Sequence, residues 1–568
     1  MTINGGERKR VFLVFIIFGL WVLVVGGSLV KIQVLDYGKN LTKVRSQSSR
    51  TFTLESKRGT IYDSSGEVLA ISVKAKSAFL GNKDKTDSLR LLNRIVKYPT
   101  IMNWEKKQEI KKRIADGDKF IWIKRKLSDQ EYDALKKIKD ANDTQSDLDF
   151  IDEYKRIYPQ ETTACHILGG VGIDEQGLWG IEQSLNSTLQ GKNCEVKAVQ
   201  DARRRAFKLQ YLTKPVDGKD IYLTIDSSIQ FFVEKELEDT VNQFQAKNGS
   251  VIVMDSRDGE ILAMAVYPNF NPAQVAATPP DVIKNKAISF LYHPGSTFKI
   301  IVAATALEKN LCSPQHKFNC YNGVYRLKGR EITDDHPHDQ LSFEEIVIYS
   351  SNIGAAKIGE RLGKQRLYDG IKRFDFGERS DIPLPGEERG IFNPLNKWSG
   401  VSLAYLSHGY EIAVTPLQMA RAFNVIASGG ELIQPSILKA INGVVIKQPE
   451  SQKILSPGTV LRMRAIMEEV VNQGTGKTTR IEGIPIAGKT GTTKKISRNK
   501  GSLRYVSSFG GFFPAKNPRV TIFVVINEPK GQFYGADVAA PLFKSIAERL
   551  LMYLKIFPEL DKKNEIKL

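Results

Sequence analysis

The stretch YHPGSTFKIIVAATALEK, Tyr292 to Lys309, places a lysine near the start of a helix that has no polar face. A Pro-Gly pair interrupts the chain just before this helix, and residues 300–307 carry one hydroxyl among otherwise apolar side chains. A helix that is apolar on all sides is expected to be buried. Lys299 is therefore predicted to be a buried amine, which is costly unless some function uses it. Ser296 lies three residues earlier, so its hydroxyl and the Lys299 amine share a helix face.

Length and charge limit the possible functions. The chain has 568 residues, too many for one core, so two or more domains are expected. A composition of 41% hydrophobic and 26% charged residues is typical of globular proteins. The formal net charge of +19 favours an anionic partner. Such a partner is nucleic acid, a membrane surface or an acidic polymer, and the spread of the basic residues along the whole chain argues against nucleic acid.

The N-terminus contains an uncharged apolar run from Val11 to Val30. At about 1.5 Å per residue it is roughly 30 Å long, enough to cross a bilayer. Arg8, Lys9 and Arg10 precede it, which predicts a cytoplasmic N-terminal tail and places everything after Lys31 outside the cytoplasm. A cleaved signal peptide is the alternative, but the run is long for one and no clear small-x-small cleavage site follows it.

Four cysteines are compatible with an oxidising compartment. Cys312 and Cys320 are close in sequence, and we predict a disulfide between them. Cys165 and Cys194 either pair or stay free. No cysteine spacing resembles a zinc site, so neither a metal nor a cofactor is expected.

Turn and strand patterns indicate a strand-rich first part. Residues 56–72 contain two apolar patches around Asp63-Ser64-Ser65-Gly66, which predicts a hairpin. Residues 83–155 are charged and show helical spacing. A glycine-rich segment follows, and near Gly218 the sequence pattern changes to that of regular strands and helices.

The second part begins with a predicted strand and an amphipathic helix over residues 219–245. Residues 249–268 predict two strands joined at Arg257-Asp258-Gly259. Residues 505–529 predict two adjacent strands, and a closing helix follows over 539–554. Strands at both ends with helices between them favour one sheet built from distant segments.

Three short motifs follow one another along this second part. Ser-x-x-Lys alone is weak, because it occurs four times, at Ser28, Ser296, Ser436 and Ser497, but only Ser296 opens a buried helix. The triplet Ser350-Ser351-Asn352 follows a helical segment, and Lys489-Thr490-Gly491 occurs once, before strand-like sequence. In this order and setting, the three motifs form the signature of penicillin-binding proteins and serine β-lactamases.

Longer blocks extend the resemblance. HPGSTFKI resembles the active-site box of class B penicillin-binding proteins, and RGTIYDSSGEVLA and RIYPQETTACHILGGVGIDEQGLWGIEQSLN resemble the two pedestal blocks of that family. SHGYEIAVTPLQMARAFNVIASGG and QFYGADVAAPLF are similar to two further transpeptidase blocks. Gly409-Tyr410 and the YPQ block are most similar to the division-specific FtsI type. The chain departs from the family pattern at His293, Glu411 and Ala536, outside the three motifs.

The resemblance implies an α+β multidomain protein: an N-terminal transmembrane helix, a strand-rich pedestal, and a penicillin-binding/β-lactamase-like transpeptidase domain with a central antiparallel sheet flanked by helices. The boundaries expected on this basis are a cytoplasmic tail 1–10, a transmembrane anchor 11–31, a non-catalytic pedestal of the dimerisation type 32–215, a transpeptidase domain 216–556 and a charged tail 557–568.

The family chemistry implies roles for the motif residues. Ser296 would attack the D-Ala-D-Ala carbonyl of a peptidoglycan stem peptide, and Lys299 would accept its proton. A free lysine titrates near about 10.4. Burial and the neighbouring charge of Lys489 would lower that pKa, although which lysine is the base stays open. Ser350 would relay the proton to the leaving amine, and Asn352 would hold the substrate amide.

The third motif would bind the donor's terminal carboxylate. Lys489, Thr490 and Thr492 are implied for this role, and Gly491 lets the backbone approach closely. The backbone amides of Ser296 and Thr492 would form the oxyanion hole. Release of D-Ala would leave an acyl-enzyme, which an amine of a second stem peptide converts into a cross-link.

The resulting prediction is a serine-type D-Ala-D-Ala transpeptidase of the acyltransferase and D,D-carboxypeptidase class, inhibited by β-lactams and used in septal wall synthesis. An elongation-type enzyme, a β-lactam-sensing receptor and a catalytically silent divisome scaffold are the alternatives. The expected location is the inner membrane, single-pass, with the catalytic domain in the periplasm. The resemblance implies an FtsW-like glycosyltransferase and other divisome proteins as partners.

Three histidines and one tyrosine near the motifs have structural explanations that we favour over functional ones. His293, His336 and His338 lie near the first two motifs and raise the question of a metal, but DDHPHD is better explained as a polar loop near the cleft. Tyr410 is expected to serve in packing rather than in catalysis.

Overall fold

The computed structural model describes residues 5–38, 49–54, 56–82, 84–141, 147–200, 206–211, 214, 216–448, 450–495 and 503–557. The chain divides into two compact units. One comprises residues 1–57 and 191–217, and the other residues 58–190 and 218–568.

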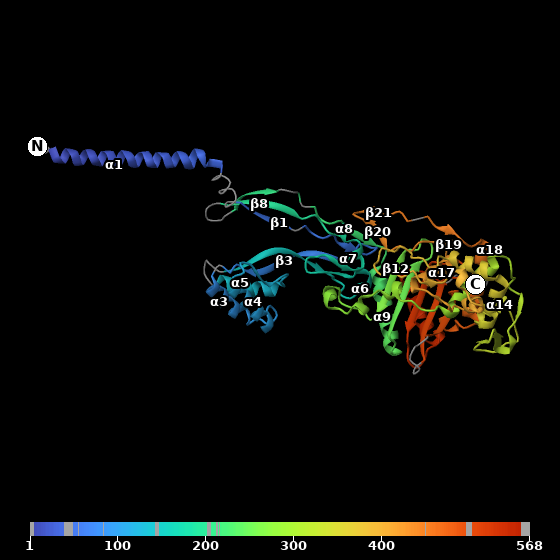
Figure 1. The fold of residues 1–568 in the computed structure, drawn as a ribbon. Helices are drawn as coiled ribbons and strands as arrows, with labels where there is room; N and C mark the ends of the chain where they lie inside the picture. Colours follow the sequence, from blue (N-terminus) through green and yellow to red (C-terminus); the bar gives the residue numbers. More distant parts are fainter. Residues whose placement is uncertain are drawn as a thin grey trace, which may run out of the picture. The chain divides into compact units, whose positions relative to one another are not determined.

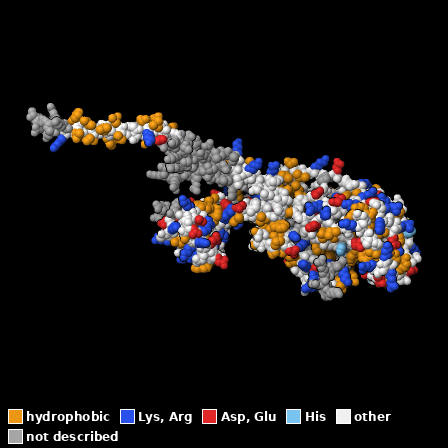
Figure 2. Space-filling view, in the orientation of Figure 1, with side chains coloured by type: hydrophobic (Ala, Val, Ile, Leu, Met, Phe, Trp, Pro, Cys, Tyr) orange, Lys and Arg blue, Asp and Glu red, His pale blue; other side chains and the backbone are white. Residues whose placement is uncertain are grey.

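The first unit contains a long apolar helix and a small sheet. Helix α1 (Gly5–Val30) continues into a π-helical turn, η1 (Lys31–Leu35). Hydrophobic side chains are exposed along the part of α1 that Figure 2 colours, and by length and composition the helix over Arg10–Leu35 is able to cross a membrane. Strands β1 (Ser49–Leu54), β8 (Cys194–Gln200) and β9 (Ala206–Tyr211) form an antiparallel sheet in the order β1-β8-β9.

The second unit begins with the hairpin predicted around Asp63. Its strands pair in antiparallel register, and the Asp63 carboxylate accepts from the amides of Ser65 and Glu67 inside the turn. A seven-stranded sheet in the order β21-β20-β10-β2-β3-β4, with β5 paired to β3, joins this region to later segments. The strands and the helices packed on them are β2 (Ile61–Tyr62), β3 (Val68–Leu80), α3 (Lys85–Ile95), α4 (Trp104–Asp116), β4 (Ile121–Lys124), α5 (Asp129–Asp140), β5 (Leu148–Ile157), β10 (Ile221–Leu223), β20 (Leu438–Ile441) and β21 (Val444–Val445).

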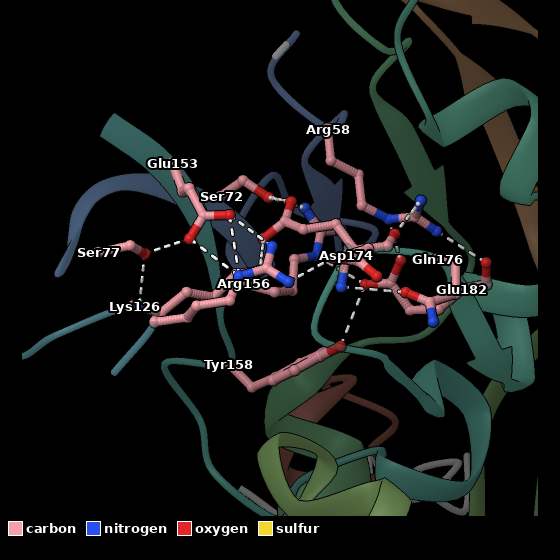
Figure 3. Close-up of polar contacts among 12 residues, drawn as sticks. Arg58, Ser72, Ser77, Lys126, Glu153, Arg156, Tyr158, Asp174, Gln176 and Glu182 are labelled. Atoms are coloured by element: carbon pink, nitrogen blue, oxygen red, sulfur yellow. Dashed lines mark hydrogen bonds and ion pairs between the residues drawn. The ribbon is translucent and has the colours of Figure 1, made fainter. Parts of the chain in front are cut away.

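A buried ion-pair network connects β5 of this sheet to residues 58 and 182 (Figure 3). Glu182 is fully buried, and its two carboxylate oxygens accept from Arg58 Nε at 2.6 Å and from Arg156 Nε at 2.7 Å. Tyr158 donates its hydroxyl to the same carboxylate at 3.3 Å. One carboxylate therefore neutralises two buried guanidinium groups drawn from segments far apart in the sequence. Short elements surround it: α6 (Cys165–Leu168), β6 (Gly170–Val171), β7 (Gly177–Trp179), α7 (Gly180–Ser184) and α8 (Asn186–Leu189).

Replacing Glu182 with alanine is expected to lower the free energy of unfolding by about 3–5 kcal/mol, because two buried guanidinium groups lose the counter-charge that they share. Urea unfolding of the second unit measures the loss. Asp152→Ala is the matched control, since its ion pair with Lys76 is solvent-exposed and such pairs contribute about 0–1 kcal/mol. Equal, small losses for both variants would contradict the account of the network.

The central sheet of the second unit runs in the order β12-β11-β25-β24-β23 and is antiparallel throughout (Figure 1). Alternate residues of β11 face opposite layers: Val251 and Val253 pack with α9 and α19, and Ile252 and Met254 pack with α12 and α17. This confirms that segments from both ends of the domain share one sheet. The strands are β11 (Asn248–Asp255), β12 (Ile261–Tyr267), β23 (Ala487–Lys495), β24 (Arg504–Phe513) and β25 (Val520–Asn527).

Helices and short strands surround this sheet. The helices are α9 (Ser227–Gln243), α10 (Pro280–Ile283), α11 (Lys286–Ser289), α12 (Lys299–Glu308), α13 (Phe343–Ile348), α14 (Asn352–Leu362), α15 (Lys364–Arg373), α16 (Ser402–Ser407), α17 (Pro416–Ala427), α18 (Pro457–Asn472) and α19 (Gly535–Tyr553). The short strands are β13 (Lys317–Asn319), β14 (Val324–Leu327), β15 (Arg330–Thr333), β16 (Gln340–Ser342), β17 (Ile391–Phe392), β18 (Ile412–Ala413), β19 (Glu431–Leu432) and β22 (Gln452–Lys453). Five 3-10 turns complete the described residues: η2 (Pro272–Ala277), η3 (Gly295–Phe298), η4 (Tyr321–Gly323), η5 (Leu395–Lys397) and η6 (Lys477–Thr479).

The predicted disulfide between Cys312 and Cys320 is wrong, because both residues are present as thiols. The Cys320 sulfur lies 3.8 Å from the Phe318 carbonyl and 3.8 Å from the Ser351 hydroxyl, so these two groups are its polar contacts. Burial raises the pKa of both thiols. Two buried cysteines close in sequence are therefore explained here by packing, not by cross-linking.

Candidate active site

Ser296 lies in the 3-10 turn η3, which leads directly into the buried helix α12. The turn is tightly enclosed: Gly295 has φ +55°, and a Cβ there would lie 2.5 Å from Thr493 Oγ1. Gly409 has φ +83°, and a Cβ on it would lie 2.2 Å from the Gly295 carbonyl oxygen. The Gly295 amide donates to the Gly409 carbonyl at 3.1 Å. Because Gly295 and Gly409 have no side chains, the backbone of the loop at Gly409 can pack directly against the turn that carries Ser296.

Lys299 is buried, as the apolar helix predicts, with 2% of its surface exposed. Its Nζ donates to the backbone carbonyl of Ser350, to Asn352 Oδ1 at 2.8 Å and to Ser350 Oγ at 3.3 Å. Burial lowers the pKa of Lys299 to about 7, while the carboxylates of Asp334 and Asp335 oppose that shift. The amine is therefore neutral in a substantial fraction of molecules near neutral pH.

Lys489 projects from β23 toward the same point. It is fully buried, and its Nζ donates to Ser350 Oγ at 2.9 Å. Burial and the charge of Lys299 together hold the pKa of Lys489 well below its usual range. Burial lowers the pKa of Lys299, as the apolar helix predicts, and the two amines interact with each other across the Ser350 hydroxyl. The Ser350 hydroxyl thus lies between two buried amines.

The turn that carries Ser350 is unusual in its backbone. Ser350 has φ +65°, a left-handed conformation that a non-glycine residue adopts only when its surroundings hold it there. Ser351 accepts from the Gly354 amide at 2.8 Å and so caps α14. Asn352 donates its Nδ2 to the Thr333 carbonyl at 2.8 Å while its oxygen accepts from Lys299. The first and third residues of this motif, Ser350 and Asn352, therefore both accept hydrogen bonds from Lys299.

The third motif lies on the edge strand β23. Thr490 and Thr475 exchange a hydroxyl hydrogen bond of 2.7 Å, and Thr492 Oγ1 accepts from the Gly535 amide at the start of α19 at 2.9 Å. A Cβ on Gly491 would lie 2.5 Å from Ser508 Oγ and 2.8 Å from a methyl carbon of Thr297. Gly491 is therefore required for β23 to approach the Ser296 turn closely.

One cleft of about 620 Å³ connects the three motifs. Ser296, Ser350, Asn352, Thr490 and Thr492 all line it, while Lys299 and Lys489 lie buried behind its wall. A volume of this size is in the usual range of ligand-binding pockets, about 300–1,000 Å³. The remaining lining side chains are acidic, imidazole or aromatic for the most part and include Asp334, Asp335, His336, His338, Tyr349, His408, Tyr410, Tyr505, Phe533 and Tyr534.

Neither of the two rival Ser-x-x-Lys serines that the structure describes lines this cleft. Ser28 is on α1. Ser436 is buried, donates to the Leu438 carbonyl and accepts from Gln448 Nε2 at 2.6 Å. Ser497 falls outside the described residues. His293, one of the three histidines considered for a metal, places Nδ1 2.6 Å from the Ile412 carbonyl oxygen.

Comparison with known families assigns both halves of the chain. Residues 249–548 match the penicillin-binding protein transpeptidase domain, and residues 53–223 match the penicillin-binding protein dimerisation domain. The chain is a class B penicillin-binding protein. It is 32% identical to stage V sporulation protein D of Bacillus subtilis over 99% of this chain and 88% of that one. It is 30% identical to the peptidoglycan D,D-transpeptidase FtsI of Escherichia coli over 94% of this chain and 90% of that one.

Solved structures give the same picture. Penicillin-binding protein 3 of Mycobacterium tuberculosis in complex with aztreonam superposes with a TM-score of 0.69 at 26% identity, covering 89% of this chain and 98% of that one. A peptidoglycan substrate and the capacity to bind β-lactams follow from membership of the family. The fold class expected from the sequence, a transpeptidase domain preceded by a dimerisation-type domain and an apolar helix, is confirmed.

Sequence reasoning missed two residues that support the cleft. Asp334 contacts the Ser350 turn, and Thr475 contacts Thr490. Neither belongs to a motif of this penicillin-binding protein. The acidic loop around Asp334 was visible in the sequence, but only as a polar loop near the cleft.

Proposed function

We propose that this penicillin-binding protein cross-links peptidoglycan stem peptides through an acyl-enzyme on Ser296. The observation that carries the proposal is the Ser350 hydroxyl, 2.9 Å from Lys489 Nζ and 3.3 Å from Lys299 Nζ, in the cleft that Ser296 lines. Such an arrangement gives a serine nucleophile a neutral amine and a relay for its proton.

The acylation step follows from these groups. Ser296 Oγ attacks the carbonyl between the two D-alanines, and its proton passes to the neutral Lys299 amine. The backbone amides of Ser296 and Thr492 stabilise the oxyanion. The proton then moves through Ser350 to the departing nitrogen, the carbon–nitrogen bond breaks, and D-Ala leaves as a free amine.

Transfer reverses the proton path. An amine of a second stem peptide attacks the ester carbonyl and gives its proton, through the same side chains, to the Ser296 oxygen. The ester bond breaks and the new amide is the cross-link. Lys489, Thr490 and Thr492 bind the donor's terminal carboxylate, Asn352 holds its amide, and water in place of the amine would give D,D-carboxypeptidase activity.

Purified full-length protein in detergent, incubated with uncross-linked glycan strands that carry pentapeptides, tests this proposal. Mass spectrometry is expected to find free D-Ala and cross-linked dimers in equal amounts, apart from any hydrolysed product. Penicillin is expected to suppress both. Dimers without D-Ala release, or neither product from a protein that binds penicillin, would contradict the proposal.

The pH dependence of acylation provides a further prediction. The rate of penicillin labelling is expected to rise as the pH increases through about 7 and then to level off, because Lys299 accepts a proton only in its neutral form. Stopped-flow labelling between about pH 5 and pH 9 measures the profile. A rate that is flat or falls across this range would exclude Lys299 as the base.

The topology of the anchor belongs to the same proposal. Residues 11–31 span the membrane, residues 1–10 stay in the cytoplasm, and the 32–215 pedestal and 216–556 transpeptidase domain lie in the periplasm, with a charged tail at 557–568. A reporter that needs the periplasm is expected to be active when fused after Lys31, because the basic residues before the apolar run stay inside. Activity of a cytoplasm-dependent reporter at the same position would reverse the orientation.

We assign the enzyme to septal synthesis, together with an FtsW-like glycosyltransferase and other divisome proteins. The Gly409-Tyr410 pair and the similarity to FtsI support this role, while the similarity to a sporulation protein makes localisation decisive. Fluorescent penicillin in growing cells is expected to mark midcell when this protein is present and to lose that signal when it is depleted. Loss of sidewall labelling instead would favour elongation.

A further inference from the structure

Asp334, at the end of β15, contacts the backbone of the second motif directly. Its Oδ1 accepts from the amide of Asn352 at 2.5 Å and from the amide of Ile353 at 3.0 Å. Its Oδ2 accepts from the Ser351 hydroxyl at 2.5 Å. Three donors from consecutive residues therefore converge on one carboxylate. Charge-assisted hydrogen bonds of this kind are about twice as strong as neutral ones.

These hydrogen bonds stabilise a turn whose backbone conformation is unfavourable at Ser350. Ser350 has φ +65°, and its hydroxyl has to stay between Lys299 and Lys489. The residue before Asp334 contributes as well, because the Thr333 carbonyl accepts from Asn352 Nδ2 at 2.8 Å. The end of β15 thus fixes both the backbone and the side chain of the motif. A carboxylate at the N-terminus of α14 also interacts favourably with the helix dipole.

We propose that Asp334 is a positioning residue of the transpeptidase: its carboxylate fixes the Ser350–Asn352 turn against Lys299 so that the Ser350 hydroxyl stays between the two amines. This inference rests on the proposed serine acyl-enzyme. It adds a residue outside the three motifs to the machinery for proton transfer. Asp334 acts through Ser350 and Asn352 rather than on the substrate.

The charge of Asp334 also acts on Lys299. The groups that face this amine are the carboxylates of Asp334 and Asp335 on the 334–339 loop, the Lys489 amine on β23, and the buried imidazole of His408 after α16. Burial keeps His408 neutral, with its pKa lowered to about 3, so it does not titrate together with Lys299. Asp334 and Asp335 hold the pKa of Lys299 up against burial. Loss of one of these two charges therefore lowers that pKa.

Two substitutions separate position from charge. Asp334→Asn removes the charge but keeps one oxygen to accept from the two amides, and its new amide group is able to donate to Ser351. Asp334→Ala removes the charge and all three hydrogen bonds. Asp339→Asn is the matched control, because Asp339 lies on the same loop, is exposed and is not among the residues that line the cleft.

The experiment measures the rate of penicillin acylation against pH for the full-length protein and each variant, with thermal unfolding as a check of folding. For Asp334→Asn we expect the midpoint of the pH profile to move to lower pH and the plateau to fall only a few-fold. For Asp334→Ala we expect the same direction of shift and a plateau at least about tenfold lower. Asp339→Asn is expected to match the wild type.

A folded Asp334→Ala variant with the wild-type plateau and midpoint would overturn the inference. If Asp334→Ala does not fold, Asp334→Asn decides: a plateau and a pH midpoint that both match the wild type would also overturn it. These outcomes differ from failure of the proposed function, in which the wild-type protein itself would not be acylated on Ser296.

Discussion

Ser296→Ala is expected to abolish covalent labelling by penicillin, with a loss of rate of at least about 10³-fold, because the variant has no oxygen to form the acyl bond. The fold is expected to survive. Side-chain caps typically contribute about 1 kcal/mol, and the η3 turn has no side-chain capping bond to lose. Gel fluorescence after incubation with labelled penicillin, alongside the thermal unfolding midpoint, measures both effects.

Ser436→Ala is the matched control for this prediction. Ser436 also precedes a lysine by three residues, but its hydroxyl is engaged with Leu438 and Gln448 away from the cleft. The control variant is expected to label like the wild type. Strong labelling of Ser296→Ala, or loss of labelling in Ser436→Ala, would show that another serine is the nucleophile.

Lys299→Ala is expected to slow acylation by at least about 10²-fold at pH 7, since removal of a general base costs about 10²–10⁴-fold. Lys489 is close to Ser350 but carries a different role in the proposal, the binding of the donor carboxylate. The remaining rate is expected to lose the rise near pH 7 that Lys299 produces. Stopped-flow labelling as a function of pH measures both changes.

Lys439→Ala serves as the control for charge and length. Lys439 belongs to the rival Ser436 motif and is not among the residues that line the cleft. Its Nζ donates to the Ser64 carbonyl at 3.0 Å. This variant is expected to keep the wild-type rate and pH profile. A Lys299→Ala variant that retained the rise near pH 7 would transfer the role of base to another group.

Much of the site could be predicted because its signals are local. A helix without a polar face in the middle of a soluble domain is expected to be buried, so the burial of Lys299 could be predicted from residues 300–307. Hairpin turns at Asp63 and Asp258 were visible in the same way. The order of the three motifs then indicated that β23, α14 and the Ser296 turn meet, and the structure places all three around one cleft.

The contacts of Asp334 could not be predicted. They depend on how the segment between Asp334 and Ser351 folds back so that its two ends meet. The chain runs through β16 and α13 between these two residues, and neither element signals where its ends meet. The disulfide failed for a related reason. Proximity of Cys312 and Cys320 in sequence does not fix the directions of their side chains, and Cys320 points toward Phe318 and Ser351.

The balance of charges around the two lysines also lay beyond the sequence. The expected effect of Lys489 on Lys299 required a distance and a degree of burial that no motif provides. The structure shows that burial dominates the pKa of Lys299 and that the carboxylates of Asp334 and Asp335 act against it. Long-range electrostatics of this kind depend on the packed structure.

Peptide mapping of the penicilloylated full-length protein tests the central claim most directly. The protein is labelled with penicillin, digested and analysed by tandem mass spectrometry, which locates the added mass on a single side chain. The account predicts one adduct, on Ser296. An adduct on Ser350, Ser436 or Ser497, with Ser296 unmodified, would contradict it.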